Sequence, residues 1–108
     1  MGGHVVQGHV DGVGRVESSE PDGEAVNMRF SAPTSVLRYV IEKGSITVNG
    51  VSLTVTAFDE QGFAVAVIPH TREVTNLGRL APGDAVNLEA DLFGKYVERF
   101  ASAPVPSV

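Results

Sequence analysis

The 108-residue sequence contains no cysteine, which excludes a disulfide framework, a thiolate metal site and a thiol nucleophile and suits a reducing compartment. It also lacks a basic excess. Its 8 lysines and arginines stand against 13 aspartates and glutamates, so the net charge is -5 and a nucleic-acid partner is not expected. No apolar run approaches the roughly 18 residues that cross a membrane, and the N-terminus lacks a signal-peptide layout. We therefore expect a cytoplasmic protein with no membrane partner.

Turn-forming residues divide the chain into short units, most of them strands. The valine-rich opening GGHVVQGHVDGVG (residues 2–14) predicts a first strand, and SSEPDG (18–23) predicts the turn that leads to a second strand over 24–30. The segment PTSVLRYVIEKG (33–44) changes to helical spacing, with Pro33 suited to a first helical position and Gly44 to a C-terminal cap. It predicts one short helix.

Asn49-Gly50 is the strongest structural signal in the chain, because this pair readily adopts positive φ at both central positions of a type I′ hairpin turn. The turn joins two strand-like runs within SITVNGVSLTVTAF (45–58). On the second run, alternation predicts an apolar face of Val51, Leu53, Val55 and Ala57 and, opposite to it, a hydroxyl ladder of Ser52, Thr54 and Thr56. Two further strands are predicted over GFAVAVIP (62–69), apolar on both faces, and AVNLEAD (85–91), after a turn at LAPGD (80–84).

Six strands joined mostly by short turns favour antiparallel pairing, and closure of such a sheet removes its exposed edges. We predict an all-β fold over residues 1–100, a six-stranded antiparallel barrel with a short helix after the second strand and a C-terminal helix. The C-terminal helix follows from the spacing of Leu92, Phe93, Tyr96, Val97 and Phe100. This stripe packs either on its own barrel or on another copy. Residues 101–108 are predicted to be a disordered tail.

The polar residues of the opening run allow several interpretations. His4 and His9 are an odd number of residues apart and point to opposite faces of a regular strand, which argues against a two-histidine metal site. The glycines lack the lysine and the helix of a phosphate-binding loop. The pKa of His9 suits proton transfer, but a surface or half-buried histidine is the plainer interpretation, and a hydroxyl ladder is most often a solvated face. No Ser-His-Asp order or H-E-x-x-H motif supports hydrolase chemistry.

Four segments, in this order, resemble the second, C-terminal barrel of riboflavin synthase of the alpha-chain type, which has two lumazine-binding repeats: GGHVVQGHVDGVG, YVIEKGSITVNGVSLTV, VIPHTREVTNLGRLAPGDAVNLEAD and KYVERF. The resemblance runs from Gly2 to about Phe100 and implies a Greek-key barrel. It also implies a substrate, 6,7-dimethyl-8-ribityllumazine. In the family one lumazine gives a four-carbon unit to another, yielding riboflavin and 5-amino-6-ribitylamino-pyrimidinedione, with no redox cofactor and no metal.

The resemblance implies roles for individual residues. His9 is the candidate for proton transfer or substrate polarisation, and Asp91 matches a carboxylate that assists at the active site. The candidate catalytic residues are His9, Lys43, Ser52 and Asp91. The candidate substrate-binding residues are His4, Gly50, Thr54, Ile68, Pro69, His70 and Thr71. Of these, the segment from Ile68 to Thr71 matches the family's ring-lining segment. A ribityl chain is a run of hydroxyl groups, for which serine, threonine and carboxylate side chains are suitable partners.

The sequence also departs from the family. The family's first barrel, with its Phe-Thr-Gly type terminus and the cysteine that often stands where this barrel has Ser52, has no counterpart here. In the family, active sites form between the first barrel of one chain and the second barrel of a neighbour in a trimer. We therefore expect a truncated gene, a fragment or a cut chain with little or no synthase activity alone, and a homo-oligomer, either a trimer through the C-terminal helix or a dimer. Two alternatives stay open: a standalone module that binds lumazine, riboflavin or FMN without turnover, and a barrel whose site has no occupant.

Overall fold

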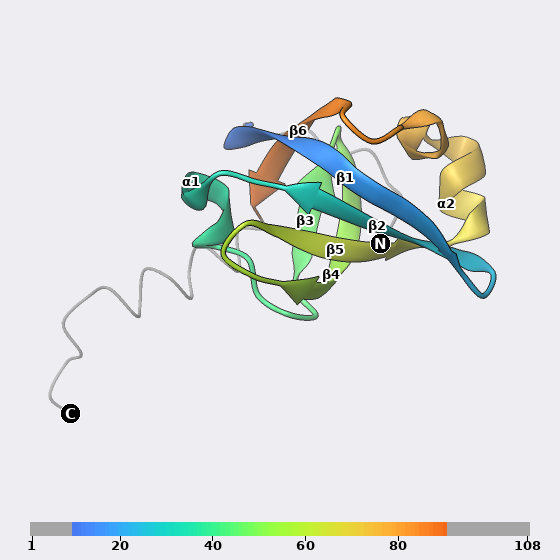
Figure 1. Cartoon of the computed structure of the whole chain (residues 1–108), viewed down its shortest axis with the longest axis horizontal. Coiled ribbons are helices and arrows are strands. Elements are labelled where there is room, and N and C mark those ends of the chain that lie inside the picture. The colour runs from blue at the N-terminus through green and yellow to red at the C-terminus, as the bar shows by residue number, and fades with distance from the viewer. Residues whose placement is uncertain (1–9, 91–108) are drawn as a thin grey trace, which may run out of the picture.

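A computed structural model describes residues 10–90. Six strands form a closed barrel in the order β1-β2-β5-β4-β3-β6, and all neighbouring pairs are antiparallel (Figure 1). The β2–β5 and β3–β6 pairings join strands that are not consecutive, as in a Greek key. The predicted barrel is confirmed. Its strands are β1 (Gly12–Asp22), β2 (Ala25–Ser31), β3 (Ser45–Val48), β4 (Val51–Phe58), β5 (Gly62–Val67) and β6 (Ala85–Ala90).

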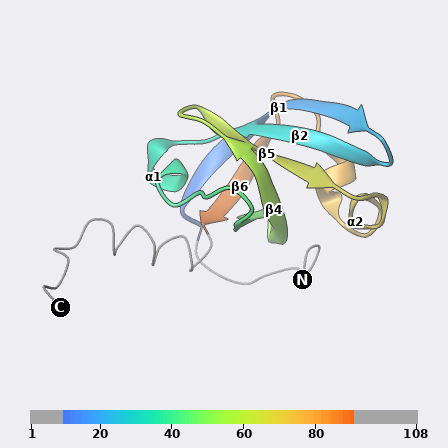
Figure 2. The same ribbon diagram turned by 90° about the horizontal axis from the view of Figure 1, so that it is seen from below.

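Within residues 10–90 three short helices accompany the barrel: α1 (Thr34–Leu37), α2 (Pro69–Val74) and the 3-10 helix η1 (Asn76–Arg79). α1 and α2 lie at opposite ends of the barrel (Figures 1 and 2). None of these described helices is long and apolar enough to span a membrane. The C-terminal helix predicted over 92–100 and the tail 101–108 fall outside the described residues.

The helix after the second strand is much shorter than the prediction of residues 33–44. Pro33 precedes α1 as its N-cap, and the helix ends at Leu37. Further along, the backbone pairs with the sheet instead of continuing the helix. The Lys43 backbone N–H donates to the Val55 carbonyl of β4 at 2.8 Å, and Lys43 has a φ of 65°. A backbone that pairs with β4 cannot also continue a helix, so the predicted cap at Gly44 is wrong. The helix α2 was not predicted, although Pro69 at its first turn is a helix-start signal.

The first hairpin turns later than the sequence predicts. SSEPDG was expected to be a turn, but β1 continues through Ser18 to Asp22, and Ser18 pairs with Arg29 while Asp22 pairs with Ala25. The turn itself is confined to the residues around Gly23, which has a φ of 64°. Long-range pairing with β2 therefore overrides the local turn preference of this segment. Most of the opening run predicted as the first strand lies outside the described residues.

The second hairpin turns where the sequence predicts. Asn49 and Gly50 have φ angles of 49° and 83°, and Val48 pairs with Val51 across them, so the type I′ signal is confirmed. Val51, Leu53 and Val55 are buried as expected. Ala57 is exposed instead, because the register of β4 against β5 shifts between Val55 and Ala57 and interrupts the alternation there.

The core fills the barrel interior with alternating strand residues. Phe30 of β2 and Phe63 of β5 are fully buried and stack with their ring centroids 5.3 Å apart. All of β5 except Ala66 is buried, in agreement with its predicted double-sided apolar pattern. Gly62 begins this strand where β2 passes closely: a Cβ atom there would overlap the carbonyl oxygen of Phe30. In residues 10–90, buried side chains from all six strands fill the barrel interior, and the polar side chains described below lie on the outer face.

Candidate functional site

The predicted hydroxyl ladder lies on the outer face of β4. Ser52 is half-buried and Thr54 exposed, and both alternate with buried residues. Thr56, the third member, donates from Oγ1 to the Ala64 carbonyl at 3.2 Å. Within residues 10–90 the hydroxyls of Ser52 and Thr54 make no hydrogen bond. Two neighbouring hydroxyls on this face are therefore available to a ligand.

The ladder continues across the sheet as a row of polar side chains. Ser52 of β4 pairs with Thr47 of β3, and Thr47 in turn pairs with Glu89 of β6. All three alternate with buried residues, so they share the outer face. We refer to Ser52, Thr47 and Glu89 as the polar row. A parallel pair, Thr54 and Ser45, lies next to it on the same two strands, β4 and β3.

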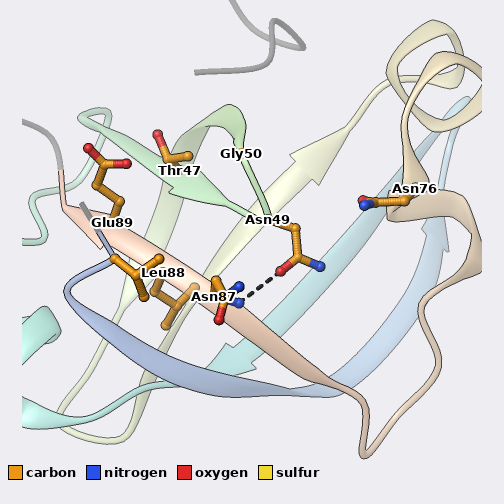
Figure 3. A pocket seen from close by; sticks show the side chains of 8 residues that line it. Thr47, Asn49, Gly50, Asn76, Asn87, Leu88 and Glu89 are labelled. Atoms are coloured by element: carbon orange, nitrogen blue, oxygen red, sulfur yellow. Dashed lines mark hydrogen bonds between the residues drawn. The ribbon is translucent and has the colours of Figure 1, made fainter. Parts of the chain in front are cut away.

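A cavity of about 330 Å³ adjoins the polar row at Thr47 and Glu89 (Figure 3). The hairpin turn, η1, β6 and the segment before β1 surround it. Its lining residues are Val10, Thr47, Asn49, Gly50, Asn76, Asn87, Leu88 and Glu89. Three side-chain amides, one hydroxyl and one carboxylate thus face a single cavity, which can bind a neutral ligand rich in hydrogen-bonding groups.

Two pairs of hydrogen bonds hold the cavity walls together. The Asn49 backbone N–H donates to the Asn87 carbonyl at 2.8 Å, and the Asn87 backbone N–H donates to Asn49 Oδ1 at 2.8 Å (Figure 3). The Asp11 N–H donates to the Leu88 carbonyl at 2.7 Å, and Asp11 Oδ2 accepts from the Ala90 N–H at 2.7 Å. The first pair joins the hairpin turn to β6. The second pair joins the segment that carries Val10 to β6 as well.

The ionisable groups in the described lining of the cavity are all acidic. Glu89, which is half-buried, is its single ionisable group, and no lysine, arginine or histidine lines it. In the part of the chain that the structure describes, no three histidine, aspartate or glutamate side chains come together in a way that could hold a metal ion. The described lining is therefore suited to neutral hydrogen-bonding groups rather than to anions.

Residues 7–91 match the family model described as the lumazine binding domain. The chain belongs to the lumazine-binding domain family. Riboflavin synthase of Mycobacterium bovis is 52% identical over 102 residues, which cover 92% of this chain and 51% of that protein. Riboflavin synthase of Actinobacillus pleuropneumoniae is 48% identical over 100 residues, which cover 93% of this chain and 46% of that protein. The lumazine-binding domain therefore spans about half the length of the curated relatives it matches, and the resemblance seen in the sequence is confirmed.

Solved structures share the barrel. The crystal structure of LumP complexed with 6,7-dimethyl-8-(1'-D-ribityl) lumazine has a TM-score of 0.72 and 24% identity, covering 81% of this chain and 49% of that chain. LumP complexed with flavin mononucleotide has a TM-score of 0.73 and 25% identity, covering 82% of this chain and 50% of that chain. The fold of the lumazine-binding domain therefore occurs in a protein crystallised with both ligands.

The structure brings some of the predicted site residues together and separates others. Ser52, Thr54 and Gly50 lie near one another on the β3–β4 hairpin, and Gly50 lines the cavity. Lys43 is exposed, and its backbone bond to Val55 places it beside the Thr54 end of the ladder. Four residues were predicted to line the ring. Ile68 directly follows β5 as the N-cap of α2, and Pro69, His70 and Thr71 form the start of α2.

The β5–α2 junction is a mixed surface. Ile68 is 56% exposed, and Pro69 and His70 are exposed as well, whereas Thr71 is 5% exposed and its carbonyl accepts the Thr75 hydroxyl at 2.5 Å. Because β4 and β5 are antiparallel, with Val55 paired to Val65, the Ser52 end of β4 runs alongside the Ile68 end of β5. An exposed apolar side chain thus lies toward the same end of the strands as the free hydroxyls.

His4, His9 and Asp91 lie outside the described residues. His9 directly precedes Val10, and Asp91 directly follows the last residue of β6. The chain therefore leads from the cavity lining to both of these predicted catalytic residues within one or two positions.

Five polar lining residues were not predicted as site residues: Thr47, Asn49, Asn76, Asn87 and Glu89. Asn49 was identified in the sequence only as a turn residue. Thr47, Asn87 and Glu89 each alternate with apolar neighbours on a strand, so their outward direction is readable, but their shared site is not. The β3–β6 pairing that joins them links strands far apart in the chain. Asn76, in a 3-10 helix that was not predicted, carries no comparable signal.

An ion-pair network lies on the outer face formed by β1, β2 and the β4–β5 turn, away from the cavity residues. Arg29 donates from Nε to Glu17 Oε1 at 3.0 Å and from Nη2 to the two carboxylate oxygens of Asp59 at 2.7 and 2.8 Å. Asp59 Oδ1 also accepts the backbone N–H groups of Gln61 and Gly62. The Arg29 hydrogen bond, followed by the turn amides, lowers the pKa of Asp59. This network stabilises the turn and contains none of the predicted site residues.

Proposed function

We propose that this lumazine-binding domain binds 6,7-dimethyl-8-ribityllumazine on the outer face of β3 and β4 and supplies one half of a riboflavin synthase active site. The observation that carries the proposal is the polar row, whose free hydroxyls lead into a cavity of neutral amides. A ribityl chain presents hydroxyl groups that donate and accept, which is the chemistry this surface complements. The lumazine complex of LumP, which has the same fold, supports the choice of ligand.

The flat ring is proposed to lie at the Ser52 and Thr54 end of the row, within reach of Lys43. Ile68 offers an exposed apolar surface on which a heterocycle can pack, and Pro69, His70 and Thr71 border it. Gly50, without a side chain, leaves room for close approach of the backbone. In this arrangement the hydroxyls hydrogen-bond polar atoms of the ligand while the junction packs on one ring face.

The proposed chemistry needs positioning and proton transfer. Two lumazine rings must meet, one must lose a proton from an acidified methyl group, and a nucleophile must add to the other. His9 is the proposed proton carrier, assisted by the Asp91 carboxylate, with Ser52 and Lys43 polarising the ring and His4 as a further binding residue. His9 precedes the cavity-lining residue Val10, and Asp91 lies two positions after the cavity-lining residue Glu89, which supports the assignment of both residues to the same site.

The domain is proposed to act together with a second barrel. It spans about half the length of the synthases it matches, and two bound rings must face each other for the four-carbon transfer. We expect the homo-oligomeric partner contact, in a trimer or a dimer, to involve the apolar stripe of residues 92–100. The chain on its own is expected to form little or no riboflavin.

A standalone binding module without turnover is the second candidate. It is favoured by the location of the polar row and the described cavity lining on a single barrel. LumP has been crystallised with lumazine, riboflavin and flavin mononucleotide, which supports a binding role for the fold. In this case the same residues hold the ligand, but no second lumazine ring lies against it to exchange the four-carbon unit.

Binding and turnover separate these functions. The 108-residue chain is titrated with 6,7-dimethyl-8-ribityllumazine while ligand fluorescence is recorded, and riboflavin formation is measured for the chain alone and after mixing with the N-terminal barrel of a related synthase. Saturable binding with turnover only in the mixture supports the half-enzyme, and binding without turnover in either sample supports the module. Riboflavin formation by the chain alone contradicts the half-enzyme. Absence of saturable binding contradicts both.

Variants locate the binding face. Ser52→Ala and Thr54→Val each remove one free hydroxyl, and we expect each to weaken lumazine binding about five- to tenfold, because one hydrogen bond contributes about 1 kcal/mol. Ser19→Ala is the matched control, since Ser19 is an exposed serine on β1. Equal affinities for all four proteins would contradict the placement of the ligand on β3 and β4.

A further inference from the structure

The cavity beside Glu89 differs in charge from a site for a phosphorylated ligand. We infer that it receives the free end of the ribityl chain and that Glu89 makes the domain select an unphosphorylated ribityl ligand over its phosphate ester. This inference rests on the proposed function and goes beyond it, because lumazine binding alone leaves the direction of the chain and the preference between riboflavin and FMN open.

The direction of the chain follows from the polar row. Ser52, Thr47 and Glu89 lie on three adjacent strands, and neighbouring strands are about 4.8 Å apart, so the row extends about 10 Å across the sheet. An extended ribityl chain fits along this length. With the ring at the Ser52 end, the middle hydroxyls pass Thr47 and the terminal hydroxyl reaches Glu89 and the cavity.

The cavity provides partners for a terminal hydroxyl. Asn76 and Asn87 contribute side-chain amides, each with donors and an acceptor, and Gly50, which has no side chain, lines the cavity at the hairpin turn (Figure 3). The Glu89 carboxylate accepts hydrogen bonds only. A hydroxyl group, which donates one and accepts others, satisfies this set. A dianionic phosphate group has no hydrogen to donate to the Glu89 carboxylate.

A phosphate at the same place would also meet a like charge, with no neutralising partner among the described lining residues. Glu89 is half-buried, so solvent screens it less than a fully exposed carboxylate, and the described lining contains no lysine, arginine or histidine. Protein sites that bind phosphate generally offer arginine, lysine or several free backbone N–H groups. The net charge of -5 for the whole chain adds to the repulsion.

Riboflavin and FMN are the matched probes, because they differ only in the phosphate on the terminal hydroxyl. Both are titrated against the 108-residue chain at about pH 8, where histidine is neutral, in low-salt buffer, and flavin fluorescence reports binding. We expect FMN to bind at least about tenfold more weakly than riboflavin. Equal affinities, or tighter binding of FMN, would overturn the inference while saturable riboflavin binding leaves the proposed function standing. If neither flavin nor lumazine binds, the proposed function fails and the inference falls with it.

The variant Glu89→Gln tests the residue itself. The substitution preserves the shape of the side chain and its capacity to form hydrogen bonds but removes the charge. The ratio of the affinity for riboflavin to the affinity for FMN should therefore fall at least threefold. Glu60→Gln is the control for net charge, because Glu60 is exposed in the β4–β5 turn, at the other end of β4 from Gly50. It should leave the ratio unchanged. A ratio that changes equally in both variants, or in neither, would overturn the role of Glu89.

A second variant keeps the test independent of Glu89. Thr47→Val removes the hydroxyl in the middle of the polar row and retains a β-branched side chain suited to the strand. We expect it to weaken riboflavin and FMN about equally, by roughly five- to tenfold, because the contact precedes the terminal group. Unchanged affinity for both flavins would overturn the proposed path of the chain. Thermal unfolding followed by circular dichroism confirms that each variant is folded.

Discussion

Asn49 is the residue at which the fold and the cavity depend on the same atoms. Its φ of 49° shapes the type I′ turn, its N–H donates to Asn87, and its side-chain oxygen accepts the Asn87 N–H at 2.8 Å. Three substitutions separate these contributions. Asn49→Asp keeps an acceptor and a residue that tolerates positive φ, Asn49→Gly keeps only the conformational freedom, and Asn49→Ala keeps neither.

The magnitudes follow from these losses. The side-chain hydrogen bond is solvent-exposed and contributes about 1 kcal/mol to the free energy of unfolding. Glycine adds about 0.5 kcal/mol of backbone entropy cost, whereas alanine at positive φ adds about 1.5 kcal/mol of strain. We therefore expect losses of about 1.5 kcal/mol for Asn49→Gly, about 2.5 kcal/mol for Asn49→Ala and less than about 0.5 kcal/mol for Asn49→Asp.

Urea unfolding measures these differences. The sequence has no tryptophan, so far-ultraviolet circular dichroism is the suitable probe of the β-barrel. The midpoint of each transition should shift without a change in slope, and the thermal midpoint should fall by about 5 °C for each kcal/mol lost. If Asn49→Gly is as destabilising as Asn49→Ala, positive φ at this position costs nothing and the reasoning on the turn is refuted. If both variants match the wild type, the bond to Asn87 contributes nothing to stability.

Two further predictions concern the rest of the barrel. Gly62→Ala places a methyl group against the carbonyl oxygen of Phe30, and we expect the free energy of unfolding in urea to fall by about 2–3 kcal/mol, whereas a loss below about 1 kcal/mol would show that β2 and β5 separate easily. The second concerns pH: Arg29 and the turn amides lower the pKa of Asp59 from 3.8, so the folded state binds this proton less readily than the unfolded state. The stabilisation is therefore complete above the unfolded pKa and is lost as the pH falls through the lowered folded value. Asp59→Asn should reduce the free energy of unfolding at neutral pH and make that free energy fall less steeply with pH below about pH 4. If the variant and the wild type lose stability equally steeply below about pH 4 in urea unfolding, the proposed contribution of Asp59 is contradicted.

Local chemistry made part of the fold predictable. Asn49-Gly50 predicted a type I′ turn because few residue pairs accept positive φ twice. The alternation on β4 predicted the outward direction of Ser52 and Thr54 because neighbouring side chains in a strand face opposite ways. The prediction of Ala57 as a core residue was wrong because a shift in strand register is a property of two paired strands. Helix length was overestimated for the same kind of reason, since hydrogen bonds of Lys43 and Gly44 to β4 end the helical path.

The candidate site shows the same division. The sequence by itself determined which chemistry each strand carries: hydroxyls on β4, amide and carboxylate on β6, and a residue order that indicated the lumazine-binding family. Only the tertiary structure decided that Ser52, Thr47 and Glu89 form one row and that Asn76 and Asn87 share a cavity with it. The physical reason is that alternation fixes the face on which a side chain lies, whereas its neighbours depend on which distant strands pair when the barrel closes.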